Sequence, residues 1–226
     1  MNNLVKEIAN VFKLNADDAV AAGMKAYMKN QFDFYGIKSP LRKELQKPFL
    51  EKSKLPKIEN VSQIAIECWQ YPKREMHYFA LDLLDKVSKK LSPQHLILVE
   101  ELVQSKSWWD TVDLISTKVS GTILLNNPER INEFASKWNL HPNMWINRMG
   151  ILFQLKYKQK TNSDILFHHC LTHASSNEFF IQKAIGWALR EYSKTNPLLV
   201  QSIIEKNNFK PLSVREGMRI ILKTNL

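Results

Sequence analysis

The sequence predicts an all-α fold, on three observations. Only 6 glycines occur in 226 residues, too few for the dense turns of a β architecture. Apolar residues recur at helical spacing along most of the chain, for example at Ala80, Leu84, Val87 and Leu91. Most prolines precede such apolar-periodic segments, where proline suits the first helical turn. These prolines are Pro40, Pro93, Pro128, Pro142, Pro197 and Pro211.

The positions of these prolines predict about a dozen short helices. The first is an amphipathic helix over residues 1–14, and another begins at Ser39 and should kink or end at Pro48. Later helices are expected at residues 80–91, 96–103, 108–120, 142–157, 180–194 and 214–221. Four of the prolines follow a residue suited to an N-cap, namely Ser39, Ser92, Asn127 and Asn196.

Short helices with brief connections can stack as pairs. At about 40 residues per repeat, the chain has room for about six HEAT-like repeats, which would form a curved α-solenoid. No sequence repeat is visible by eye, so an irregular helical bundle is the alternative. The connections contain no linker, and we expect residues 1–226 to form a single domain.

Charge points to a polyanionic partner. The chain has 32 Lys+Arg against 22 Asp+Glu, a formal net charge of +10. A generally basic surface is the alternative. No leader or long apolar run is present, and Cys68 and Cys170 are too few for a disulfide framework. We therefore expect a soluble, cytoplasmic protein that has no contact with a membrane and keeps both thiols reduced.

The first candidate site lies in the segment Ser107-Trp108-Trp109-Asp110-Thr111-Val112-Asp113. At 100° per residue, Trp108 belongs to an apolar stripe with Val112, Ile115 and Val119. Trp109 instead aligns with Asp113, Ser116 and Ser120 on a polar face about a quarter turn away. A large aromatic side chain beside a carboxylate, away from the core, indicates a site.

Residues 180–194 carry the second candidate. One side of this helix presents Ile181, Ile185, Ala188 and Tyr192, and the nearly opposite side presents Lys183, Trp187, Arg190 and Lys194. The core does not need Trp187, so it packs on a neighbouring helix or meets a ligand. Three cations in its stripe favour an anionic ligand such as a nucleic-acid backbone. Arg215, Arg219 and Lys223 form a second basic stripe, for which a solvated surface is an equal alternative.

Arg148 is the third candidate, because the helix around it is apolar nearly all round and should be buried. A buried guanidinium needs a carboxylate or phosphate partner, and a structural salt bridge is the alternative to a binding role. His168, His169, Cys170 and His173 form an incomplete metal grouping, for which ordinary surface or core histidines are the favoured interpretation. We predict no metal and no cofactor.

Several segments together resemble a known family. The S-W-W-D-T-V-D run, Arg148 within W-I-N-R-M-G and Trp187 within A-I-G-W-A-L-R-E-Y look like the AlkD-type DNA alkylation repair glycosylases, which are built of HEAT-like repeats. The stretches at residues 25–32 and 36–40 are similar to that family too. The resemblance spans most of the chain, and the W-W-D-T-V-D run is specific for this group.

The resemblance implies a monofunctional, monomeric DNA glycosylase that removes N3- or N7-alkylated purines from double-stranded DNA and so starts base excision repair. Asp113 matches the family's catalytic carboxylate, and Trp109 and Trp187 match the aromatic pair that packs on the lesion nucleotide. Arg148 matches a phosphate-binding arginine, and Tyr27 falls where an N-terminal helix approaches the nucleotide. Lys183, Arg190 and Lys194 are the further candidates for DNA binding.

Two other functions fit the same sequence. A non-catalytic HEAT-like protein could bind distorted or branched DNA by shape through the same basic strip. A helical-repeat scaffold could bind an acidic protein instead. Loss of base release on changing Asp113 distinguishes the glycosylase from the first, and a steep salt dependence of duplex affinity distinguishes it from the second.

Overall fold

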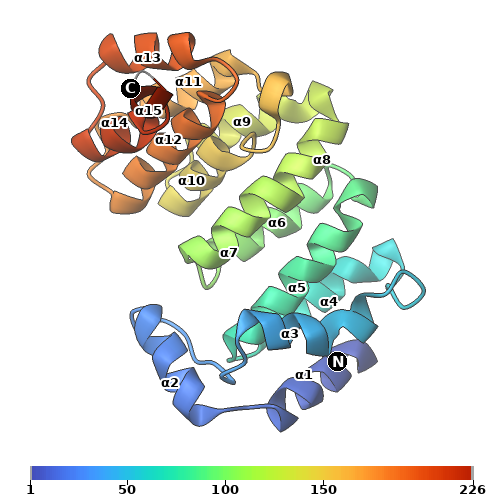
Figure 1. Cartoon of the computed structure of the whole chain (residues 1–226). Helices are drawn as coiled ribbons and strands as arrows, with labels where there is room; N and C mark the ends of the chain where they lie inside the picture. Colours follow the sequence, from blue (N-terminus) through green and yellow to red (C-terminus); the bar gives the residue numbers. More distant parts are fainter. Residues whose placement is uncertain (1, 225–226) are drawn as a thin grey trace. The chain divides into compact units, whose positions relative to one another are not determined.

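All regular structure in the chain is helical over residues 2–224, the part that the computed structural model describes. A single β-bridge between Asp33 and Lys73 is the only strand-like pairing among these residues. The all-α prediction is thus confirmed, and the succession of short helices is consistent with a helical-repeat fold (Figure 1). None of the helices in this part is long and apolar enough to cross a membrane.

Two compact units make up the chain, one of residues 1–91 and one of residues 92–226. The expectations of one domain and of a curved solenoid therefore stay predictions.

Unit 1 contains five α-helices among the described residues. They are α1 (Asn3–Leu14), α2 (Asp18–Tyr27), α3 (Ser39–Gln46), α4 (Ile58–Gln70) and α5 (Arg74–Val87), with short 3-10 turns at Lys47–Leu50 and Ser88–Lys90. α1 confirms the predicted amphipathic N-terminal helix, since Val5, Ile8 and Phe12 are fully buried. The helix begun at Ser39 ends at Gln46, and Pro48 lies in the 3-10 turn that follows, as its ring and missing N–H predict.

Helix α2 differs from its neighbours because it contains no buried residue, and Figure 1 shows it standing apart from α4 and α5. The loop that follows it is fixed by Glu75 of α5. This fully buried carboxylate accepts hydrogen bonds from the backbone N–H groups of Tyr35, Gly36 and Ile37 at 2.9, 2.9 and 3.1 Å. Gly36 has a φ of +93°, and a Cβ there would lie 1.9 Å from the Asp17 carbonyl oxygen, so only glycine fits.

Unit 2 contains the remaining helices. They are α6 (His95–Gln104), α7 (Trp109–Leu114), α8 (Gly121–Asn126), α9 (Ile131–Asn139), α10 (Met144–Leu152), α11 (Ser163–Thr172), α12 (Phe179–Tyr192), α13 (Pro197–Glu205), α14 (Pro211–Met218) and α15 (Ile221–Thr224). A π-helical turn, Ile115–Ser120, joins α7 to α8, and 3-10 turns occur at Pro128–Arg130 and Lys158–Lys160.

Helix starts in unit 2 follow the prolines closely. Asn196 caps α13 by accepting a hydrogen bond from the Leu199 N–H, with Pro197 next in the chain. α10 is shorter than predicted: it begins at Met144, where Asn143 caps it, and ends at Leu152. Residues 153–156, between the end of α10 and Tyr157, form turns rather than helix.

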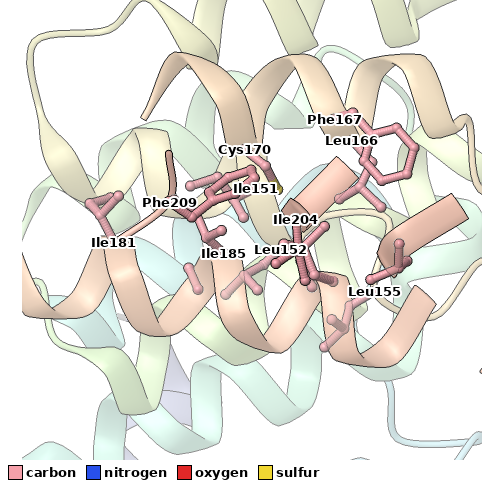
Figure 2. Packing of buried hydrophobic residues seen from close by; sticks show 14 of the residues in the cluster. Ile151, Leu152, Leu155, Leu166, Phe167, Cys170, Ile181, Ile185, Ile204 and Phe209 are labelled. Atoms are coloured by element: carbon pink, nitrogen blue, oxygen red, sulfur yellow. The ribbon is translucent and has the colours of Figure 1, made fainter. Parts of the chain in front are cut away.

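The core of unit 2 holds α12 in place. Its apolar stripe, with Ile181, Ile185 and Leu189, packs against side chains from α10, α11 and α13 (Figure 2). Trp187 and Tyr192 are partly buried against the same core. Burying one stripe of α12 leaves the other side of the helix to form the site.

Candidate functional site

Trp108 and Trp109 occupy different structural positions at the start of α7. Trp108 is the N-cap residue, with extended backbone angles of φ −161° and ψ 160°, so it is not the first residue of the predicted apolar helical stripe. Its ring is half-buried and packs against Phe180 at 5.1 Å and Trp145 at 5.9 Å between centroids. Trp109 begins the helix, and Asp113 follows one turn later.

Asp113 forms a bidentate ion pair with Arg148 of α10. The Arg148 Nε donates to Oδ1 at 2.7 Å, and Nη2 donates to Oδ2 at 2.8 Å. Nη1 donates to the backbone carbonyl of Phe180. The sequence required an anionic partner for a buried arginine, and that partner is the Asp113 carboxylate.

Burial governs the electrostatics of this pair. The Arg148 side chain is 5% exposed and that of Asp113 is 18% exposed. Burial raises the pKa of the Asp113 carboxyl, while the hydrogen bonds and positive charge of Arg148 act in the opposite direction. Arg148 is thus the group that favours an ionised Asp113.

Ser116 and Ser120, predicted on the polar face with Trp109, are fully buried. The π-helical turn of residues 115–120 has more residues per turn than an α-helix, so phasing at 100° misplaces these two serines, although Ile115 and Val119 are buried as predicted. The hydroxyls are satisfied locally: Ser116 donates to the Val112 carbonyl at 2.6 Å and Ser120 to the Ser116 carbonyl at 3.0 Å. Ser116 and Ser120 are therefore structural residues.

Helix α12 presents Lys183, Trp187 and Arg190 on one face, as predicted. All three line one hollow together with Trp109, Asp113 and Arg148. Lys194 does not line it. It is exposed and pairs with Glu191, with 2.6 Å between Nζ and Oε2.

Three lining residues were not expected from the sequence: Phe179, Phe180 and Glu216. Phe179 is 57% exposed and meets the Phe180 ring edge-on at 5.4 Å. Glu216 of α14 accepts hydrogen bonds from the Lys183 Nζ at 2.8 Å and from Arg190 Nη1 at 2.7 Å. The Lys183 hydrogen bond is the largest of the influences that lower the pKa of Glu216.

The hollow has a volume of about 280 Å³. Its charged side chains are Arg148, Lys183 and Arg190 against Asp113 and Glu216, and its aromatic side chains are Trp109, Phe179, Phe180 and Trp187. Aromatic faces beside a buried carboxylate suit a flat or cationic group, while the cations suit neighbouring anions. The arrangement can therefore hold a ligand that carries both.

Tyr27 belongs to unit 1, whereas the hollow and the second basic stripe belong to unit 2. Tyr27 ends α2 in unit 1 and is 69% exposed. Arg215 of α14, Arg219 in the turn that follows and Lys223 of α15 are all exposed. The roles expected for these four residues stay predictions.

The histidine grouping of α11 belongs to the core and its edge. His169 is 1% exposed, and Cys170 is fully buried in the hydrophobic core. The His173 imidazole Nε2 lies 3.1 Å from the Asn139 carbonyl. Across residues 2–224, no group of three or more His, Cys, Asp or Glu side chains could hold a metal ion.

Comparisons with known proteins agree over nearly the whole chain. The model of a family described as "DNA alkylation repair enzyme" matches residues 8–221. A solved structure described as "Predicted DNA alkylation repair enzyme from Enterococcus faecalis" is similar with a TM-score of 0.87 and 35% sequence identity, covering 92% of this chain and 97% of that chain. Among curated proteins, no sequence matches the chain.

Proposed function

Because the chain belongs to the DNA alkylation repair enzyme family, we propose that it is a DNA glycosylase for alkylated purines. Its substrates would be N3- and N7-alkylated purines such as 3-methyladenine and 7-methylguanine in duplex DNA. The observation that carries the proposal is the Asp113 carboxylate, fixed by two Arg148 hydrogen bonds in a hollow lined by Trp109 and Trp187.

The chemistry of an alkylated purine requires few catalytic groups. Alkylation at N3 or N7 gives the base a positive charge, so the C1′–N bond can break with its electron pair going to the base, which leaves neutral. Positive charge then develops on the deoxyribose, and water adds to C1′ and loses a proton. The enzyme must stabilise that sugar cation and position the water.

Asp113 suits both tasks in this proposal. Each of its oxygens accepts one hydrogen bond from Arg148, which leaves each with a further lone pair for a water molecule. An ionised carboxylate in a poorly solvated hollow attracts the developing sugar cation more strongly than it would in water. Trp109 and Trp187 would pack on the lesion nucleotide and add the attraction of their ring faces for positive charge.

The cations of the hollow would hold the DNA backbone. Arg148 has five N–H groups, of which three point to Asp113 and the Phe180 carbonyl. The remaining two could donate to a phosphate while the carboxylate stays fixed. Lys183 and Arg190 would contact phosphates beside Trp187, and Tyr27 and Lys194 are further DNA contacts in the proposal.

Base release from methylated duplex DNA tests the proposal directly. Under single-turnover conditions the protein should liberate 7-methylguanine and 3-methyladenine, measured by chromatography. Asp113→Asn should slow release by on the order of a hundredfold, because it removes the negative charge and leaves the shape. The DNA strand should stay intact until alkali treatment, as expected of a monofunctional glycosylase.

Asp164→Asn is the matched control. It makes the same chemical change at an exposed position in the first turn of α11, outside the hollow. Its release rate should equal that of the wild type. No release by the wild type, or undiminished release by Asp113→Asn, means that the protein is not a glycosylase of this kind. Salt-sensitive duplex binding without release would instead identify a protein that binds DNA without acting on it.

A further inference from the structure

Glu216 is the second carboxylate of the hollow, besides Asp113. Its two oxygens are divided between two cations: Oε1 lies 2.8 Å from the Lys183 Nζ, and Oε2 lies 2.7 Å from Arg190 Nη1. The Glu216 side chain is only 15% exposed, against 38% for Lys183 and 24% for Arg190. The proposed chemistry at Asp113 makes no direct use of Glu216.

Gly186 allows this bridge to form. Lys183, Gly186, Trp187 and Arg190 stand at i, i+3, i+4 and i+7 on α12, so they share one face. α14 packs closely against this helix, and a Cβ at Gly186 would lie only 2.5 Å from the Glu216 Cβ. The missing side chain therefore gives Glu216 room to reach one cation on each side of Trp187.

A bridge of this kind fixes two flexible side chains. Lysine and arginine each have several rotatable bonds, and ordering them at the moment of binding would weaken binding. The Glu216 carboxylate has already ordered both in the protein alone. It also cancels one positive charge and repels phosphate, so it lowers general affinity for DNA.

We propose that Glu216 is a positioning residue, which holds Lys183 and Arg190 on either side of Trp187 for the phosphates that flank a damaged nucleotide. This inference rests on the proposed function. Glu216 would lower the general affinity for duplex DNA and raise the discrimination between damaged and intact DNA. Removing a residue that only stabilised the fold would lower both the general affinity and the discrimination.

Glu216→Gln tests this exchange, because it keeps the side-chain shape and removes the charge. Two duplexes serve as probes, one undamaged and one carrying a tetrahydrofuran abasic-site analogue. The variant should bind the undamaged duplex as tightly as the wild type or more tightly, with a steeper salt dependence. It should lose its preference for the analogue, and release of 7-methylguanine at saturating protein should fall by on the order of tenfold or more.

Two further variants isolate the cause. Glu205→Gln removes an equal charge from an exposed position of α13 outside the hollow, so it should leave both preference and release unchanged. In a Lys183→Gln, Arg190→Gln background, adding Glu216→Gln should have no further effect, because Glu216 acts through those two cations. Circular dichroism and thermal unfolding check that each variant is folded.

Several results would overturn the inference. They are equal behaviour of Glu216→Gln and Glu205→Gln, a loss of undamaged-duplex affinity in Glu216→Gln, and a full effect in the doubly substituted background. The binding comparison does not depend on catalysis. A wild type that releases no base but prefers the analogue through Glu216 would therefore refute the glycosylase proposal alone, whereas a wild type with no preference would refute the inference.

Discussion

Replacing Arg148 by methionine tests the central ion pair most directly. The substitution keeps a long unbranched side chain and removes the charge and three hydrogen bonds, two to Asp113 and one to the Phe180 carbonyl. Removing one partner of a buried pair costs about 3–5 kcal/mol. Asp113 keeps 18% of its side chain exposed, so the low end, about 3 kcal/mol, applies to it. The unpaired carbonyl adds about 1 kcal/mol.

The cost should depend on pH in a defined direction. Burial raises the pKa of Asp113 and Arg148 opposes that effect, so loss of Arg148 raises the pKa further. A carboxyl whose pKa is higher in the folded than in the unfolded protein destabilises the fold as pH rises through that interval. The Arg148→Met penalty is therefore largest at neutral pH and shrinks as acid protonates Asp113.

Urea unfolding, followed by circular dichroism at pH 7 and pH 5, measures these quantities. The series comprises wild type, Arg148→Met, Asp113→Asn and the double variant. We expect Arg148→Met to lose about 4 kcal/mol at pH 7 and less at pH 5. The double variant should be more stable than Arg148→Met, because no unpaired charge remains. Additive effects of the two substitutions, or a penalty that grows in acid, would refute the reasoning.

Three other substitutions or conditions give direct tests. Burial lowers the pKa of His169 from an ordinary value near 6.5 to about 4. Between these two pH values the folded state therefore binds fewer protons than the unfolded state. The free energy of unfolding should drop by about 2 kcal/mol from pH 7 to pH 5, and by less in His169→Gln, as urea titrations will show. In Gly121→Ala the new Cβ would lie 2.4 Å from the Phe153 carbonyl oxygen, and we expect a loss of about 2–3 kcal/mol by the same assay. Glu75→Gln should speed amide hydrogen exchange at Tyr35, Gly36 and Ile37, because their N–H groups donate hydrogen bonds to the Glu75 carboxylate. Unchanged exchange would contradict this role of Glu75.

Sequence phasing succeeded where a helix is long and regular. α12 is an uninterrupted α-helix of 14 residues, so the spacing of Lys183, Trp187 and Arg190 placed them on one face. The need of Arg148 for an anion was also visible in the sequence, because its neighbours along α10 are apolar. Which anion it meets was not visible, since Asp113 lies 35 residues away in the chain.

Phasing misplaced two serines where the backbone departs from α-helical geometry, although it assigned Ile115 and Val119 of the same segment correctly to the core. The π-helical turn at Ile115–Ser120 moved Ser116 and Ser120 from the predicted polar face into the core. Phe180 and Glu216 were missed because their roles depend on contacts with α10 and α12 that no local pattern encodes. Gly186 was the available signal: a glycine within a long helix favours close approach of another segment, which here is α14.

In the proposed function, attraction of the duplex and catalysis at the lesion depend on different charges of the protein. Its cations are Arg148, Lys183 and Arg190, and each is already paired with a carboxylate. The hollow thus has a net charge of only +1, against a formal net charge of +10 for the chain. Long-range attraction to a duplex must come from the other charges, since it scales with the excess charge that phosphates meet. Within the hollow, the paired cations contribute little attraction at a distance, but their fixed positions suit the transition-state stabilisation that the proposed function requires.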